Sequence, residues 1–310
     1  MTSPPGGPEG GFGHDLLVHD SDEQLHASVA AFVEEGLAAG GEVVVFDPGL
    51  GASALGQSLP RHLRVAYRPA EPLMPDSVRG LFAAQLRQRP SPPPPGLWAV
   101  GVVAPDEAAR AAWPRLEALA NVVLAGLPLR TLCTYDTRTL SPDVVDVGRA
   151  THRFEWRDGA RDLNPAFRPP EGYLSARGQQ RLMPPPGEAT VTTILTSTAD
   201  LSLARRVVRP CLTRAGLEPA TVSGFLTALN EVLVNALTHG AAPVWLRLWA
   251  TPHRLTCEVV DSGRGVPDVL AGCRPPVAGG PLGLWVARQT CDDLDIHNLD
   301  NGCAVVLTTT

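Results

Sequence analysis

A proline- and glycine-rich stretch at residues 164–190 constrains the fold of this chain more than any other feature. It reads NPAFRPPEGYLSARGQQRLMPPPGEAT, and it shows neither the helical nor the strand periodicity of a packed element. Its composition is typical of linkers, and a length of 310 residues exceeds what one hydrophobic core usually organises. We therefore expect two domains, at 12–163 and 188–310, joined by a linker at 164–187.

The first half alternates apolar strand-like runs with helical patterns. The runs DLLVHD, EVVVFD, LRVAYR, LWAVGVVA and TLCTYD resemble strands, and DEQLHASVAAFVEEGLAAG has the apolar spacing of a helix. Alternation of this kind predicts an α/β domain with a parallel or mixed sheet covered by helices.

The second half predicts a different architecture. A strand, TVTTILTS, precedes a helix from Asp200 to about Ala215, and a second helix contains LNEVLVNALTHG. Two hairpins follow, VWLRLWA with RLTCEVVD and LDIHNL with CAVVLTT, with a helix from about Leu284 between them. Helices gathered beside a largely antiparallel sheet predict an α+β sandwich.

Composition and charge exclude several classes of protein. The chain is 44% hydrophobic and 19% charged, and no apolar run approaches the roughly 20 residues that span a bilayer. The N-terminus has no signal-peptide pattern, so we expect a cytoplasmic protein that does not enter a membrane. The formal charge of −6 gives no electrostatic reason to bind nucleic acid, and the absence of Lys excludes a Walker P-loop.

The six cysteines form no CxxC pair and no His/Cys cluster at the spacing of metal ligands. We therefore expect reduced, mostly buried thiols.

Three polar side chains, Glu231, Asn235 and His239, recur every four residues in LNEVLVNALTHG and share one helix face. In a cleft, the Asn235 oxygen suits Mg²⁺, and the Glu231 carboxylate can orient or deprotonate a nucleophile. The alternative is a solvated helix face, with His239 near the helix C-terminus, where a cation is favourable.

Two glycine-containing segments follow this helix. DSGRGVPD, at 261–268, places Asp261 at a strand end, where its carboxylate can accept a hydrogen bond from an adenine amino group. Gly263 and Gly265 would let the backbone approach the base, whereas a simple turn is the alternative. VAGGPLGLWVARQ, at 277–289, leads a glycine segment into a helix whose first N–H groups can hold phosphate oxygens.

Together and in this order, the three segments resemble the N, G1 and G2 boxes of the histidine-kinase-like ATPase superfamily, which has the Bergerat fold. The form ExxxNAxxHG and the segment PLGLWVARQTCDDLDI are most similar to the anti-sigma-factor serine/threonine kinases of actinobacteria. The resemblance covers 188–310 and implies ATP and Mg²⁺ as cofactors.

By this resemblance, Asn235 binds Mg²⁺, Glu231 acts as general base and Asp261 bonds the adenine. The other nucleotide-binding residues that it implies are His239, Gly263, Gly265, Gly279, Gly280, Gly283 and Leu284. Relatives often have a Gly-Thr pair entering the last strand, whereas this chain has Gly302-Cys303, which leaves a secondary adenine contact open.

The first half resembles the MEDS sensory domain over roughly 12–160. The resemblance rests on GFGHDLLVHDSDEQLHASVAAFVEEGLAAGGEVVVFD and LCTYDTRTLSPDVVDVGRATH. It implies a small-molecule ligand, for which the candidate positions are His14, Asp47, Tyr135 and His152 at strand or helix ends. The alternative is that each of these residues is structural.

These resemblances predict a cytoplasmic switch, in which a sensory domain controls an ATP-binding domain. That domain would sequester a sigma factor, or phosphorylate a STAS-type anti-anti-sigma protein on Ser or Thr, or do both. A non-catalytic ATP-binding module is the first alternative. A histidine kinase is a weaker one, because its only candidate phosphoacceptor lies in THRFEW at 151–156, next to the linker. A homodimer remains open.

Overall fold

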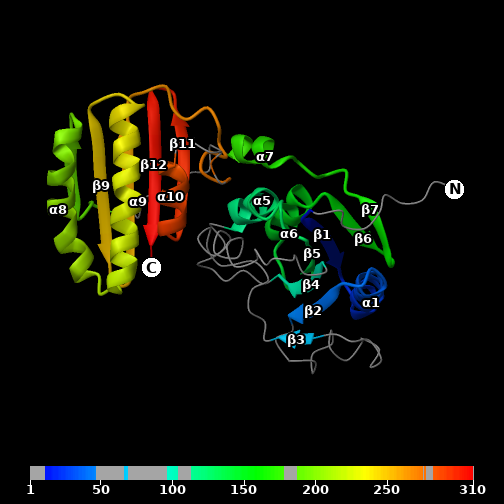
Figure 1. Cartoon of the computed structure of the whole chain (residues 1–310). Coiled ribbons are helices and arrows are strands. Elements are labelled where there is room, and N and C mark those ends of the chain that lie inside the picture. The colour runs from blue at the N-terminus through cyan, green and yellow to red at the C-terminus, as the bar shows by residue number, and fades with distance from the viewer. Residues whose placement is uncertain are drawn as a thin grey trace. The chain divides into compact units, whose positions relative to one another are not determined.

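The computed structural model describes residues 11–46, 66–68, 96–103, 113–177, 187–274, 276 and 282–309. The chain divides into two compact units, and the division falls between Tyr173 and Leu174. Each unit has a sheet covered by helices (Figure 1). The expected two-domain arrangement is therefore confirmed.

The described part of the N-terminal unit contains a seven-stranded mixed sheet in the order β3-β2-β4-β5-β1-β6-β7. The strands are β1 (Gly13–His19), β2 (Glu42–Phe46), β3 (Ala66–Arg68), β4 (Leu97–Val102), β5 (Leu129–Asp136), β6 (Phe154–Arg157) and β7 (Ala160–Leu163). Neighbouring strands pair in parallel, except that β6 and β7 are antiparallel. The carboxyl ends of the parallel strands therefore meet at one edge, where open α/β sheets place ligand sites.

Helices cover both faces of this sheet. They are α1 (Asp22–Ala38), α5 (Trp113–Val123) and α6 (Pro142–Thr151). Consecutive strand residues point to opposite faces: Leu17 packs in a buried cluster with Phe32 of α1, whereas Leu16 lies against Gly148 of α6. The helix α1 begins where the Ser21 hydroxyl accepts a hydrogen bond from the Gln24 N–H, as expected for an N-cap.

The C-terminal unit contains a five-stranded antiparallel sheet in the order β11-β12-β10-β9-β8. Its strands are β8 (Val191–Leu195), β9 (Val244–Thr251), β10 (Arg254–Asp261), β11 (Asp293–Leu299) and β12 (Gly302–Thr309). The helices are α8 (Leu201–Arg214), α9 (Pro219–Thr238) and α10 (Gly283–Thr290), after a short 3₁₀ turn at Thr198–Asp200. One buried core joins all three helices to the sheet, so the expected α+β arrangement is confirmed.

The helix α9 is the one described helix that is long and apolar enough to cross a membrane. Its apolar face is instead part of the core, since Phe225, Leu229 and Val232 are each 0% or 1% exposed. A central helix of a folded domain passes the same test of length and hydropathy.

The segment expected to be a linker begins as part of the N-terminal unit. The Asn164 side chain donates hydrogen bonds to the carbonyls of Arg149 and His152, both at 2.7 Å. The helix α7 (Pro170–Arg177) follows, and its Tyr173 is 5% exposed. Composition alone did not indicate these anchors, because a few specific contacts fix a segment that lacks periodicity.

Candidate functional site

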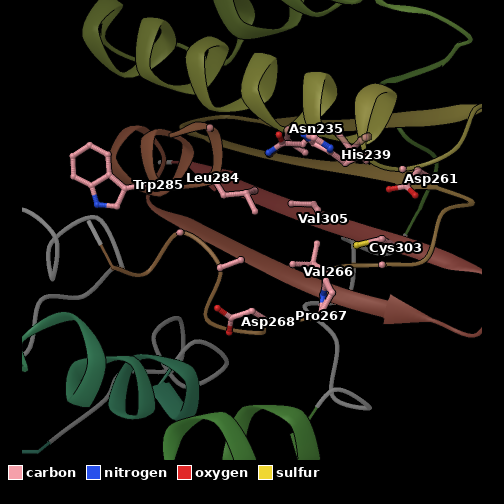
Figure 2. Close-up of a pocket in the computed structure, with 18 of the residues that line it drawn as sticks. Asn235, His239, Asp261, Val266, Pro267, Asp268, Leu284, Trp285, Cys303 and Val305 are labelled. Carbon is pink, nitrogen blue, oxygen red and sulfur yellow. The ribbon is translucent and has the colours of Figure 1, made fainter. Parts of the chain in front are cut away.

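A cavity of about 540 Å³ lies among α9, the end of β10 and the start of α10 (Figure 2). Its walls are mostly apolar, from Val232, Ala236, Val259, Val266, Leu284 and Val305. The polar side chains that line it belong to Asn235, His239, Asp261, Asp268 and Arg274. An apolar slot with a few polar groups is the usual form of a site for a flat organic ligand.

Asp261 ends β10 at this cavity and is 7% exposed. Its Oδ1 accepts a hydrogen bond from the Gly263 N–H at 2.7 Å. A Cβ atom on Gly240 would lie 2.5 Å from the same oxygen, and one on Gly263 would lie 2.7 Å from the Gly240 Cα. Glycine at these two positions therefore lets the end of α9 approach Asp261, whose Oδ2 has lone pairs suited to an exocyclic amino group.

The loop after β10 is fixed by Asn298 of β11. The Val266 N–H donates to Asn298 Oδ1, and Asn298 Nδ2 donates to the Val266 carbonyl, both at 2.8 Å. Gly265 has a φ of +81°, and a Cβ there would lie 2.3 Å from Asn298 Oδ1. Sequence reasoning selected Gly265 and missed Asn298, because no local pattern marks a partner 32 residues away.

A buried arginine fixes the loop that contributes Ala271 to the cavity lining. Arg288 of α10 is 3% exposed; its Nε donates to the Ala271 carbonyl at 3.0 Å and its Nη1 to the Leu294 carbonyl at 2.9 Å. These bonds tie the loop at 266–274 to α10 and β11. Sequence reasoning missed this residue, since an arginine in the last turn of a helix is ordinarily a surface group.

The predicted residues of α9 meet α10 at Gly283. A Cβ on Gly283 would lie 3.0 Å from Glu231 Oε2 and 3.3 Å from Asn235 Nδ2. Asn235 lines the cavity, whereas the Glu231 side chain packs beside Gly283 and does not belong to the lining. His239, which caps α9, also lines the cavity (Figure 2).

The structure therefore brings most of the predicted site residues together. Those that line the cavity are Asn235, His239, Asp261, Gly265, Gly283 and Leu284. The Gly263 N–H donates a hydrogen bond to Asp261, and the Glu231 side chain lies beside Gly283, outside the cavity lining. Gly279 and Gly280 lie outside the described residues.

Cys303 follows Gly302 at the start of β12. It lines the cavity and pairs with Asp261 across the two strands. Burial, and then the charge of Asp261, raise the pKa of the Cys303 thiol to about 11, so the thiol is neutral at pH 7. A thiol is a weaker hydrogen-bond partner than a hydroxyl, so any contact of residue 303 with a ligand is mainly apolar.

The comparisons with known proteins agree with this geometry. Residues 194–309 match the family model of the histidine kinase-like ATPase domain, and residues 13–153 match that of MEDS, the MEthanogen/methylotroph, DcmR Sensory domain. The chain thus joins a MEDS domain to a histidine kinase-like ATPase domain. No curated protein matches it.

Similar solved structures include two bacterial histidine kinases. One is the Acinetobacter baumannii histidine kinase AdeS, at 14% identity over 44% of this chain and 73% of that chain, with a TM-score of 0.25. The other is the histidine kinase domain of the blue-light activated histidine kinase EL346 from Erythrobacter litoralis, at 17% identity over 75% and 94%, with a TM-score of 0.24.

An ATPase domain of this kind implies ATP binding, and the cavity fits that ligand. Its apolar walls suit a purine, and Asp261 suits the purine amino group. Among the described lining residues, Arg274 and His239 are the side chains that can carry positive charge towards phosphates. Sequence reasoning missed Arg274, which no motif singles out.

The MEDS domain has a second, polar cavity of about 410 Å³ at the carboxyl ends of β1 and β6. His19 ends β1 there and is 4% exposed, and Ser28 of α1 is 1% exposed. Neither His19 Nδ1 nor Ser28 Oγ has a hydrogen-bond partner among the described residues. Burial lowers the pKa of His19 despite the opposing charge of Asp136, so the cavity presents a neutral imidazole.

The candidate ligand positions from the sequence lie elsewhere. His14, Tyr135 and His152 are buried together on the sheet face covered by α5 and α6, and none of them lines the polar cavity. Asp47 lies outside the described residues.

Proposed function

We propose that this protein is an ATP-dependent signalling switch, whose MEDS domain controls a nucleotide-binding domain of the anti-sigma type. The observation that carries the proposal is the 540 Å³ cavity, where Asn235, Asp261 and Gly265 converge from separate segments of one family-matched domain.

Residue roles follow from the chemistry of the side chains. Asp261 accepts the hydrogen bond of the adenine amino group, and the Asn235 amide oxygen binds the Mg²⁺ that accompanies ATP. The N-terminus of α10, at Gly283 and Leu284, offers backbone N–H groups to the phosphates. When bound, Mg·ATP supplies the phosphoryl group, and Glu231 orients the acceptor hydroxyl and takes its proton.

The output of this switch is capture of a sigma factor, phosphorylation of a STAS-type antagonist on Ser or Thr, or both. Support comes from the ExxxNAxxHG helix and the PLGLWVARQTCDDLDI segment, which most resemble anti-sigma-factor kinases. The input is a small polar ligand of the MEDS domain. The polar cavity supports this role, because His19 and Ser28 line it and each carries a buried polar atom with no hydrogen-bond partner among the described residues.

A non-catalytic nucleotide-binding module is the second candidate. The observation that favours it is the position of Glu231, which lies beside Gly283 and outside the cavity lining. A histidine kinase is disfavoured, because His152 of THRFEW is 0% exposed and cannot present its ring to ATP without unfolding of its surroundings.

The test is capture of partners by the full chain from an extract of its native host, with and without Mg·ATP, followed by incubation with γ-labelled ATP. The proposal expects ATP-dependent capture of a sigma factor or a STAS-type protein, and an acid-stable phosphate on the latter for the kinase. Capture without phosphate transfer supports the non-catalytic module. Binding of ATP with neither class of protein captured contradicts the anti-sigma assignment.

A further inference from the structure

Four side chains far apart in sequence meet in the interior of the MEDS domain. His14 comes from β1, Glu117 from α5, Cys133 from β5 and His152 from the end of α6. Each is at most 4% exposed. One ring nitrogen of each histidine and the Cys133 sulfur lie within 4.8 Å of one another.

The hydrogen bonds within this cluster are incomplete. His14 Nε2 lies 3.3 Å and His152 Nε2 lies 3.7 Å from Glu117 Oε2. None of these three atoms has a hydrogen-bond partner of good geometry among the described residues. Unpaired buried polar atoms are costly, and a cation bound between these three atoms would satisfy all of them.

The surrounding groups fix the orientation that a metal ligand requires. The Gly148 carbonyl lies 2.8 Å from His152 Nδ1 and can only accept, so Nδ1 carries the proton and Nε2 keeps its lone pair. Tyr135 donates to Glu117 Oε1 at 2.9 Å. Ligating histidines commonly donate their second nitrogen to a backbone carbonyl in this way.

We propose that His14, His152 and Cys133 bind one divalent transition-metal cation of the Zn²⁺ class, with Glu117 as the neighbouring counter-charge. Binding replaces the thiol proton of Cys133, which leaves to solvent, with a metal–sulfur bond. The dication, the thiolate and the Glu117 carboxylate then sum to zero charge. A tetrahedral Zn²⁺ site separates its ligands by about 3.3 to 3.8 Å, so the side chains close by about an ångström around the ion.

All four side chains are at most 4% exposed, so the ion would be closed off from solvent and from a substrate, which fits a structural or sensory metal better than a catalytic one. The site joins β1, β5 and α6, and therefore links the metal to the stability of the MEDS domain. Sequence reasoning found no metal-ligand spacing, because positions 14, 117, 133 and 152 become neighbours only in the folded sheet.

The test uses the full chain, stripped of metal by a chelator and titrated with Co²⁺, a spectroscopic substitute for Zn²⁺. We expect one equivalent to bind, with a thiolate-to-cobalt charge-transfer band and a higher melting temperature. Cys133→Ala should lose the band. Cys303→Ala is the matched control, because Cys303 is also buried but lines the nucleotide cavity, and it should keep the band.

The proposal is overturned if wild type shows no charge-transfer band, or if Cys133→Ala keeps it. If Cys133→Ala does not fold, X-ray absorption of the Zn²⁺-loaded wild type decides the question. A shell with one sulfur and two imidazole nitrogens supports the site, and a shell without sulfur refutes it.

Discussion

Asp261→Asn tests the base-recognition role of the nucleotide cavity. The substitution keeps an oxygen that can accept the 2.7 Å hydrogen bond from the Gly263 N–H, so the end of β10 should hold its shape. The other carboxylate oxygen becomes an NH₂ group, which opposes the amino group of adenine. A hydrogen bond to a charged group contributes about 1.5–3 kcal/mol, which corresponds to a loss of roughly 10- to 150-fold in ATP affinity.

The change in specificity is sharper than the change in affinity. Guanine presents a carbonyl oxygen where adenine has its amino group, so the new NH₂ group can donate to it. The preference for ATP over GTP should therefore shrink or reverse. The assay is calorimetric titration of the full chain with each nucleotide and Mg²⁺.

Asp268→Asn is the matched control for this substitution. Asp268 also lines the cavity, but it is exposed, and its Oδ1 accepts a bond from the Leu270 N–H that an amide oxygen can keep. Its affinity for ATP should stay within about threefold of wild type, since the loss of an exposed charge is worth well under 1 kcal/mol. If Asp261→Asn binds ATP as tightly as wild type does and keeps the same preference for ATP over GTP, the proposed role of Asp261 is refuted.

Three further predictions concern catalysis, the MEDS core and domain independence. Glu231→Gln should slow phosphate transfer to a captured partner by roughly 10²- to 10⁴-fold while ATP affinity changes little; equal transfer rates would remove Glu231 from the mechanism. Asp15→Asn should cost about 3–5 kcal/mol at pH 7, because buried Asp15 accepts bonds from Arg130, Arg161 and Trp156. Burial alone would raise the pKa of Asp15, but the bonds and charges of Arg161 and Arg130 and the bond from Trp156 hold it below its usual value. The ionised Asp15 therefore contributes its full stabilisation above about pH 4, and this stabilisation is lost progressively as the pH falls further. The stability gap between wild type and Asp15→Asn should therefore stay constant from pH 7 to about 5 and narrow by about 1 kcal/mol by pH 3, because one proton changes stability by at most about 1.36 kcal/mol per pH unit. A gap that stays constant down to pH 3, or widens, would contradict the sign. A fragment of about residues 186–310 should fold and bind ATP alone. If circular dichroism shows that the fragment is folded but calorimetry detects no ATP binding, the nucleotide site does not lie wholly within this domain.

The sequence pattern predicted the helices and hairpins, which depend on residues close together in the chain. The helices expected at α1 and α9 and the two expected hairpins all appear in the structure. The order of the strands in the sheets did not follow from these patterns, because pairing is decided by contacts between distant segments.

The same distinction applies to the residues of the nucleotide cavity. Asn235, Asp261 and Gly265 belong to short motifs, and the structure places all three at one cavity. Asn298 and Arg288 act through partners that no motif contains. The sequence indicated only part of the buried cluster of His14, Glu117, Cys133 and His152 in the MEDS domain. His14, Tyr135 and His152 were selected as polar strand or helix ends, but the buried carboxylate and thiol that join them were not.

The most direct test of the central claim is a melting curve of wild type and Asn235→Ala with ATP, in the presence and absence of Mg²⁺. A ligand that binds only the folded state adds about 2.7 kcal/mol at 100 times its dissociation constant. Alanine is the better helix former, so the variant should fold without ligand. We predict that wild type gains stability with Mg·ATP and that Asn235→Ala loses most of the magnesium-dependent part of the gain. An unchanged response of Asn235→Ala to Mg·ATP would mean that Glu231, Asn235 and His239 form a solvated helix face rather than a nucleotide site.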